Sequence, residues 1–198
     1  MKFILASNNE KKLKEMREIL FAMGHEVRSQ REAGLDFAVE ETGETFLENA
    51  RLKAAAVVEL TGEAAIADDS GLEVEALDGE PGVQSAYYGG EACKTDWERL
   101  QYLLGQMEGE VNRRAWFVST IVCLFPDGSR IEAQGRIQGE ILKAPVGDGG
   151  FGYDPVFYVP EAGRSFAEMT AEEKNGLSHR GRALMAFKEK WESYLKES

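Results

Sequence analysis

The segment that most constrains the fold is residues 115–125, AWFVSTIVCLF, which is rich in β-branched and aromatic residues. Such residues favour strands because they pack well on a pleated, half-buried surface. The turn signal Pro-Asp-Gly-Ser follows at residues 126–129, and residues 130–141 continue with an extended pattern. We therefore expect a long antiparallel hairpin over residues 115–141.

The first 24 residues predict a strand, a polar turn and a helix in succession. Residues 3–6 read as a short buried strand, and the turn Ser7-Asn8-Asn9 then offers residue types that cap helices well. Apolar residues follow at helical spacing up to a terminating glycine: Leu13, Met16, Ile19, Leu20, Met23 and Gly24.

Further helices are expected to begin near Thr45 and Thr95, because each has a glutamate three residues later, as in a capping box. A short helix is expected from Thr170, and a longer one after Ser178.

Two strands are expected around an acidic pair. Residues 64–67 read as a strand that ends at this pair, and residues 72–76 alternate apolar and acidic residues as in a half-exposed strand. The mixture of βα units with a long hairpin indicates an α/β protein with a mixed sheet.

The composition restricts what the protein binds. The formal net charge is −12 over 198 residues, so binding to a nucleic acid polymer is not expected. A small phosphate ligand remains compatible with this charge if lysines, arginines or a metal ion meet it locally.

The cysteines and the N-terminus predict the compartment. The two cysteines lie in no CxxC pair, and with two histidines they do not complete the usual structural zinc patterns. We expect free thiols in a reducing compartment. The first apolar run has four residues before Ser7, too few for a secretory or membrane-spanning segment, so no membrane association and a cytoplasmic location are expected.

The turn SNNEKK at residues 7–12 is a candidate anion site. A strand that enters a helix through a polar turn presents backbone N–H groups and the positive end of the helix dipole, and Lys12 adds a full charge. The alternative is a capped surface helix with solvated lysines. The turn itself matches neither the Walker pattern nor GxGxxG.

The adjacent acids in IADDSGL, Asp68 and Asp69, are a candidate metal site. Successive side chains in extended backbone point to opposite faces, so one acid is expected to face a ligand while its neighbour turns away. Carboxylates at a strand end suit Mg²⁺. Glu40-Glu41 is a second such pair. The alternative for both pairs is a role in turns and caps.

Two later segments carry further candidates. In GGFGYDP, Phe151 or Tyr153 would stack on a flat ligand, unless both are core aromatics. In EKNGLSHRGRALMAF, Ser178 is a candidate N-cap that puts His179 and Arg180 in the first helical turn. Cations there oppose the helix dipole, which makes sense if they face an anion or an array of acceptors. A Ser–His–Asp triad is disfavoured because no GxSxG elbow exists.

Five segments in order resemble the inosine triphosphate pyrophosphatase family, also called the non-canonical purine nucleoside triphosphate pyrophosphatases: ASNNEKK, EETGETFLENA, AIADDSGL, GGFGYDP and EKNGLSHRGRAL. The resemblance implies one domain over residues 1–198, with an elongated mixed sheet, flanking helices and two lobes around a central nucleotide cleft. It also implies a homodimeric, Mg²⁺-dependent house-cleaning enzyme. Its substrates would be ITP, dITP and XTP, and its products the monophosphate and pyrophosphate.

The resemblance also assigns roles by position. Asp69 resembles the catalytic base, and Glu40 and Asp69 the metal carboxylates. The residues that resemble substrate ligands are Ser7, Asn8, Asn9, Glu10, Lys11, Lys12, Lys53, Ser70, Phe151, Gly152, Tyr153, Asp154, Lys174, His179 and Arg180. One departure is Asn8, which stands where many members have glycine, and it bears on the backbone path over the phosphates.

Three alternatives stay open at this point. The chain could be a pyrophosphatase for modified pyrimidine nucleotides, a nucleotide sensor without turnover, or a simple phosphatase. The paired carboxylates argue against a sensor, because acids beside phosphate help binding only when a metal bridges them.

Overall fold

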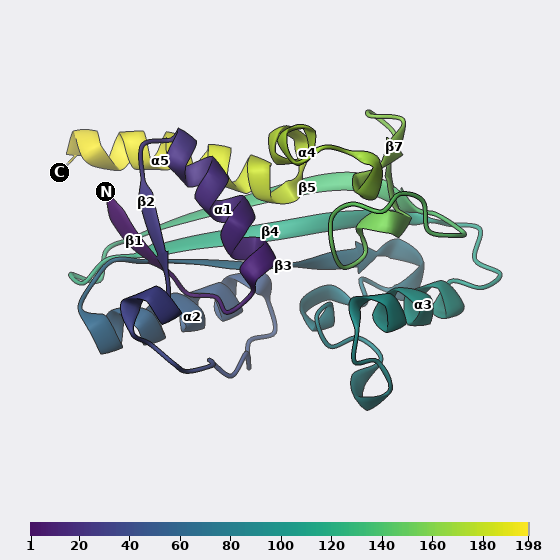
Figure 1. The fold of residues 1–198 in the computed structure, drawn as a ribbon, viewed down its shortest axis with the longest axis horizontal. Helices are drawn as coiled ribbons and strands as arrows, with labels where there is room; N and C mark the ends of the chain where they lie inside the picture. The colour runs from purple at the N-terminus through teal and green to yellow at the C-terminus, as the bar shows by residue number, and fades with distance from the viewer. Residues whose placement is uncertain (198) are drawn as a thin grey trace. The chain divides into compact units, whose positions relative to one another are not determined.

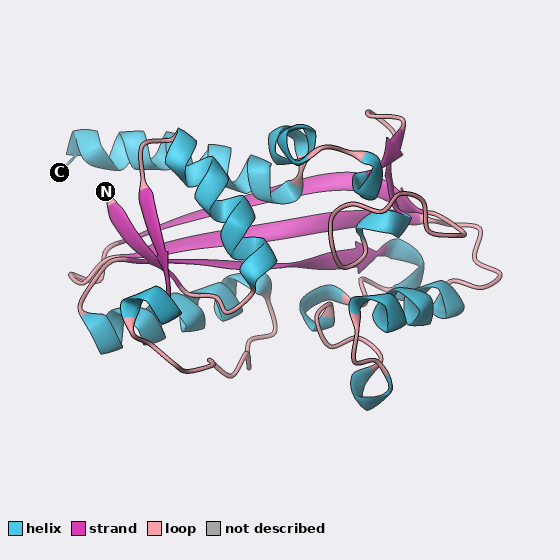
Figure 2. Cartoon of the chain, viewed as in Figure 1, coloured by secondary structure: helices cyan, strands magenta, loops and turns pink. Residues whose placement is uncertain are grey.

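A computed structural model gives the fold of residues 1–197, which contains a seven-stranded mixed sheet (Figures 1 and 2). The strand order is β2-β1-β3-β4-β5-β6-β7. The strands are β1 Lys2–Leu5, β2 Glu26–Ser29, β3 Ala65–Val74, β4 Arg114–Leu124, β5 Arg130–Ile141, β6 Phe157–Val159 and β7 Arg164–Ser165. The helices of four residues or more are α1 Glu10–Ala22, α2 Phe46–Thr61, α3 Asp96–Gln106, α4 Ala171–Leu177 and α5 His179–Glu197.

Strand pairing explains why the sheet is mixed. β1 pairs in parallel with both β2 and β3, and β6 pairs antiparallel with β5 and β7. The predicted α/β class is therefore confirmed. Over residues 1–197, none of the helices combines the length and apolar character that a membrane crossing requires.

The chain forms two compact units. Unit 1 comprises residues 1–69, 119–135 and 179–198, and unit 2 comprises residues 70–118 and 136–178. The chain passes from one unit to the other within the long strands β3, β4 and β5.

Unit 1 has a strand layer with helices on both faces, and the side-chain alternation of β1 shows how. Phe3 and Leu5 pack in a core with apolar residues of α1 and α5, whereas Ile4 packs with Ala50 and Ala54 of α2. Period-two alternation thus sends neighbouring side chains to opposite helical layers. Figure 1 shows α1 and α5 on one side of these strands and α2 on the other.

Unit 2 has its own core. Apolar residues of α3 pack with the distal parts of β3, β4 and β5 and with β6, and Phe117, Phe157 and Phe166 make ring contacts in this core. Both cysteines of the chain are free, as expected, and both are buried.

Local signals placed most helices correctly. Capping boxes form at Thr45, Thr95 and Thr170, and α5 begins directly after Ser178. The predicted hairpin is present as β4 and β5, which are neighbours in the sheet.

The expectation around the acidic pair was wrong in one respect. Residues 64–67 and 72–76 are not separate strands, because β3 runs without a break over Ala65–Val74 and contains both aspartates. The parallel neighbour β1 does end here, since Leu5 is opposite Ile66 in register. The edge strand β2 was not predicted.

Candidate active site

The turn from β1 into α1 is held by its own side chains. Ser7 Oγ accepts a hydrogen bond from the Asn9 amide nitrogen at 3.1 Å. Asn9 Oδ1 caps α1 by accepting from the amide nitrogens of Lys11 and Lys12 at 3.0 and 3.1 Å. The side-chain amide of Asn9 keeps N–H donors that suit a phosphate oxygen.

Asn8 is accommodated without strain. Its Nδ2 donates to the carbonyl oxygen of Phe37 at 3.0 Å. Among residues 1–197, Asp78 is the one non-glycine residue with a positive φ, so the backbone at position 8 does not require glycine. Glu10 and Lys11 are exposed in the first turn of α1.

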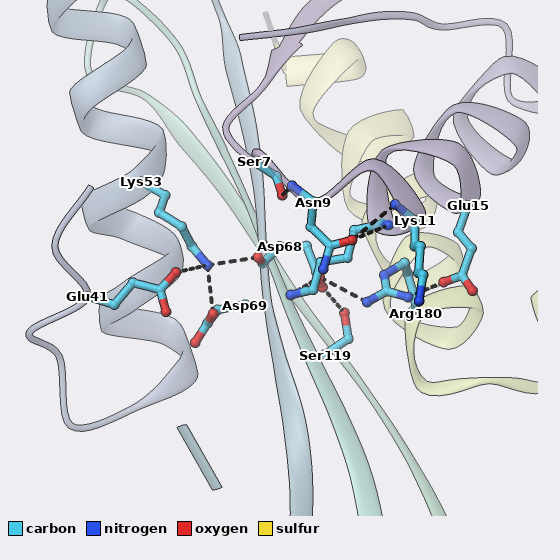
Figure 3. Close-up of polar contacts among 11 residues, drawn as sticks. Ser7, Asn9, Lys11, Glu15, Glu41, Lys53, Asp68, Asp69, Ser119 and Arg180 are labelled. Atoms are coloured by element: carbon cyan, nitrogen blue, oxygen red, sulfur yellow. Dashed lines mark hydrogen bonds and ion pairs between the residues drawn. The ribbon is translucent and has the colours of Figure 1, made fainter. Parts of the chain in front are cut away.

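Asp68 and Asp69 are neighbours in β3, and their side chains reach opposite helical layers (Figure 3). Lys12 of α1 lies 3.0 Å from Asp68 Oδ2, and Lys53 of α2 lies 2.6 Å from Asp69 Oδ1. The alternation follows the rest of β3, in which Ile66 packs with α1 and α5. The prediction that the two side chains point to opposite faces of the strand is confirmed.

On the α2 side, Lys53 Nζ gathers three oxygens. It lies 2.6 Å from Asp69 Oδ1, 3.0 Å from the carbonyl oxygen of Asp68 and 3.1 Å from Glu41 Oε1. Burial alone lowers the pKa of Lys53, but Asp69 and Glu41 more than offset this effect, so the pKa is raised and the ammonium is retained.

The second carboxylate oxygen of Asp69 differs from the other oxygens around Lys53. Asp69 Oδ2 is buried and has no hydrogen-bond partner. Burial raises the pKa of Asp69, and this effect outweighs the opposite effect of Lys53. A buried carboxylate oxygen without a donor carries an energetic cost unless a ligand, water or cation meets it.

On the α1 and α5 side, Asp68 is buried among donors. Ser119 Oγ donates to its Oδ1 at 2.5 Å, while Arg180 Nη2 lies 3.1 Å and Lys12 Nζ 3.0 Å from its Oδ2. Arg180 Nη1 also pairs with Glu15 of α1. Burial tends to raise the pKa of Asp68, but Arg180 and Lys12 hold it well below its usual range.

The cluster of charged residues around Asp68 and Asp69 has a net negative charge, which is compatible with binding a metal ion. Three cations face four carboxylates, which sums to −1: Lys12, Lys53 and Arg180 against Glu15, Glu41, Asp68 and Asp69. Over residues 1–197, no group of three or more His, Cys, Asp or Glu side chains is arranged to hold a metal. Mg²⁺ commonly needs only one or two carboxylates besides water and phosphate oxygens. Asp69 Oδ2 with Glu41 therefore fits such an ion.

The two glutamates before α2 differ in placement. Glu41 is half-buried and points toward Lys53 (Figure 3), whereas Glu40 is exposed. The resemblance assigned the metal to Glu40. In the structure it is Glu41 that contacts Lys53, the lysine that also contacts Asp69.

The first turn of α5 lies directly against β5. A Cβ atom added to Gly135 would come within 2.1 Å of the carbonyl oxygen of His179 and 2.2 Å of the amide nitrogen of Ala183. Only glycine allows this approach, which places the buried residues His179 and Arg180 against β5, and Arg180 within reach of Asp68 in β3.

The remaining candidates belong to unit 2. Lys174 Nζ lies 2.7 Å from Asp154 Oδ2 and 4.7 Å from the centre of the Phe151 ring. Asp154 Oδ2 also accepts from the Phe151 amide nitrogen at 2.8 Å, which closes the glycine-rich loop. Ser70 is half-buried in β3.

The two loop aromatics have different environments. Tyr153 is buried, and its hydroxyl donates to the carbonyl oxygen of Ser85 at 2.8 Å, so it is a core residue. The Gly152 amide nitrogen donates to Asp96 Oδ2 at 3.2 Å. Phe151 is half-buried, and the Lys174 ammonium lies over its ring.

Comparison with known proteins shows which family this chain belongs to. The model of the Ham1 family matches residues 3–190. The chain belongs to the Ham1 family. It is 54% identical over 192 residues to a dITP/XTP pyrophosphatase of Thermus thermophilus, a match that covers 96% of this chain and 91% of the relative. It is 50% identical over 196 residues to the Nostoc enzyme of the same name, covering 98% and 96%.

Solved structures of the Ham1 family agree. The Staphylococcus aureus Ham1 protein superposes with a TM-score of 0.87 at 40% identity, covering 98% of this chain and all of that chain. A dITP/XTP pyrophosphatase from Mycobacterium abscessus superposes with a TM-score of 0.76 at 42% identity, covering 94% and 98%. The resemblance to the inosine triphosphate pyrophosphatases is thereby confirmed.

Sequence reasoning gave no role to two members of the cluster, Glu15 and Ser119, and named Glu41 only as part of the Glu40–Glu41 pair. Glu41 follows from the alternation already applied to the acidic pairs. Glu15 stands three residues after Lys12 and so shares a face of α1 with it. Ser119 carries no local signal, because its role depends on the strand that lies beside β4.

Proposed function

We propose that this protein hydrolyses the non-canonical purine nucleoside triphosphates ITP, dITP and XTP to the monophosphate and pyrophosphate, and so clears them from the nucleotide pool. The observation that carries the proposal is the buried Oδ2 of Asp69, which has no hydrogen-bond partner and lies beside Lys53. Asp69 lies in β3 shortly after the point where the neighbouring strand β1 ends and the chain turns into α1. The high identity to relatives named dITP/XTP pyrophosphatase supports the substrate class.

The cation in this proposal is Mg²⁺. Asp69 and a glutamate of the Glu40–Glu41 pair would hold it, with Glu41 the nearer to Lys53. When bound, such an ion neutralises phosphate charge and lowers the pKa of coordinated water. The cluster charge of −1 supports the requirement, because a triphosphate with about four negative charges would otherwise meet a net negative site.

We assign the triphosphate to the turn at the start of α1. The side chains of Ser7, Asn9 and Lys12 and the amide groups of the turn present donors, and the positive end of the α1 dipole points the same way. Lys53 contributes the second cation. Asn8 and Glu10 belong to the same turn and would act through backbone groups, whereas Lys11, whose amide nitrogen donates to Asn9 Oδ1, would act through its exposed side chain.

The hydrolytic step follows from these placements. Asp69 orients a water molecule and accepts its proton while the water oxygen attacks the α-phosphorus in line. The bond from the α-phosphorus to the bridging oxygen breaks, and pyrophosphate leaves with that oxygen and its charge near Lys12 and Lys53. Such phosphoryl transfers rest mainly on positioning and electrostatic stabilisation.

We assign the base to Ser70, Phe151–Asp154, Lys174 and His179. Hypoxanthine and xanthine carry an O6 acceptor where adenine carries an amino donor, so a buried donor favours the former. Each donor left unpaired against adenine costs about 1–3 kcal/mol. Arg180 already pairs with Glu15 and Asp68, so we assign it to holding Asp68 of β3 in place. We assign the contact with the base to His179.

Three further properties belong to the proposal. The protein would act as a homodimer, as a single domain over residues 1–198, and in the cytoplasm, where free thiols such as Cys93 and Cys123 persist.

Product identity tests the function. Purified protein with Mg²⁺ is given dITP, ITP, XTP, ATP, GTP, dUTP and a modified dTTP, and pyrophosphate and orthophosphate are measured separately. The proposal expects pyrophosphate from dITP, ITP and XTP, at a rate about tenfold or more above ATP if the His179 donor discriminates, and none in EDTA. Orthophosphate as the first product indicates a phosphatase, and binding without turnover indicates a sensor.

A further inference from the structure

We propose that Ser119 and Glu15 are positioning residues for triphosphate binding, which act through Asp68 and Arg180 to hold the Lys12 ammonium in place. The inference rests on the proposed function, because that function assigns Lys12 to the phosphates. All five residues belong to unit 1.

The contacts form a chain of alternating charge. Glu15 pairs with Arg180 Nη1, Arg180 Nη2 lies 3.1 Å from Asp68 Oδ2, and the same oxygen lies 3.0 Å from Lys12 Nζ. Lys12 and Arg180 therefore share one carboxylate oxygen. Figure 3 shows Arg180 between Glu15 and Asp68, with Ser119 below Asp68.

Ser119 fixes the orientation of the shared carboxylate. Its hydroxyl donates to Asp68 Oδ1 at 2.5 Å, and the residue is fully buried. Without this bond the carboxylate could rotate about its χ2 torsion, which is broad for aspartate. Rotation would move Oδ2, and the Lys12 ammonium would follow it.

Glu15 fixes the guanidinium on the other side. Because Arg180 pairs with Glu15 as well as with Asp68, its guanidinium does not occupy Asp68 Oδ2 alone, and Lys12 can bind the same oxygen. With Glu15 neutralised, the guanidinium loses its second carboxylate, moves further onto Asp68 Oδ2 and displaces the Lys12 ammonium from that oxygen.

The consequence is a preordered lysine. A lysine side chain loses substantial rotamer freedom when it binds, and a residue that is already ordered loses less. Lys12 reaches its place from the first turn of α1, next to the capped turn that would receive the phosphates.

The test is a double-mutant cycle. Ser119→Ala, Ser119→Cys and Lys12→Ala are made singly, and Ser119→Ala is combined with Lys12→Ala. KM and kcat are measured for dITP with Mg²⁺, and the dissociation constant of inorganic pyrophosphate is measured by calorimetry. Circular dichroism and melting temperature establish that each variant is folded.

We expect Ser119→Ala to raise KM and the pyrophosphate dissociation constant at least fivefold with kcat within twofold. Ser119→Cys, which keeps a weak donor in nearly the same volume, falls between. In the Lys12→Ala background, Ser119→Ala changes both constants by less than twofold, because residues that act through one group are not additive. Equal effects in both backgrounds, or no effect in the native background, would overturn the proposal.

Glu15→Gln gives a second, milder variant. It is expected to raise KM at least threefold, whereas Glu18→Gln, an exposed glutamate of the same helix, leaves KM unchanged. Equal KM values for the two variants contradict the role of Glu15. If the native protein releases no pyrophosphate from dITP, the proposed function fails, while the pyrophosphate binding measurements still decide whether Ser119 and Lys12 are coupled.

Discussion

Asp68 and Asp69 are adjacent in β3, yet Asp68 pairs with Lys12 of α1 and Asp69 with Lys53 of α2. Strand alternation separates their chemistry. Asp68 is surrounded by donors on both oxygens, whereas Asp69 has one buried oxygen without a partner. Mutation of Asp69 should therefore lower turnover, whereas mutation of Asp68 should lower the stability of the fold.

Asp69→Asn should abolish most turnover and leave the fold intact. Loss of a general base typically lowers the rate by about a hundredfold or more. The melting temperature should not fall, because burial already disfavours the charge of Asp69 and raises its pKa. Steady-state pyrophosphate release and a thermal melt check both parts. A kcat within tenfold of the native value would remove Asp69 from the role of base.

Asp68→Ala should instead unfold easily. It leaves Arg180 and Lys12 buried without their common carboxylate, and breaking a buried ion pair costs about 3–5 kcal/mol. Urea denaturation measures this loss, with Asp36→Ala, an exposed aspartate of the same unit, as the control. A destabilisation below about 1 kcal/mol contradicts the idea that the network holds this region together.

The glutamate pair before α2 allows a matched comparison. Glu41→Gln should raise the Mg²⁺ concentration for half-maximal activity at least about tenfold, as loss of residues that support a metal site commonly does. Glu40→Gln, at an exposed position, should change it less than twofold. Titration of activity with Mg²⁺ decides between them, and the reverse order would return the metal to Glu40.

His25 predicts acid sensitivity remote from the site. Its ring is buried against Phe3 and Trp191, at centroid distances of 5.5 and 5.4 Å. Burial, with a smaller effect of the N-terminal ammonium, lowers its pKa, so the folded state disfavours the charged ring.

The sign of the pH effect follows. The unfolded chain takes up a proton on His25 below about pH 6.5, and the folded chain resists it, so this contribution to stability is complete above that pH and falls below it. Urea midpoints at pH 7.5 and 5.5 should drop further for the native protein than for His25→Phe. Equal drops in the two proteins would contradict a neutral buried histidine.

Much of the fold could be predicted because its signals are local. Capping boxes at Thr45 and Thr95 depend on residues three positions apart, and the β4–β5 hairpin on strand composition and a turn. The strand β2, with the sequence EVRS, was missed because an edge strand carries charged residues and lacks an apolar pattern.

The site was harder to predict because its partners are distant in sequence. Alternation separated Asp68 from Asp69, but two acids inside one strand are compatible with folding only because Lys12, Arg180 and Lys53 arrive from three helices. For the same reason the break expected at this pair does not occur.

The most direct test of the central claim is hydrolysis of dITP in water enriched in oxygen-18, followed by mass spectrometry of both products. If Asp69 directs water to the α-phosphorus, the label appears in the nucleoside monophosphate and the pyrophosphate stays unlabelled. Label in the pyrophosphate would mean attack at the β-phosphorus, and would contradict the account.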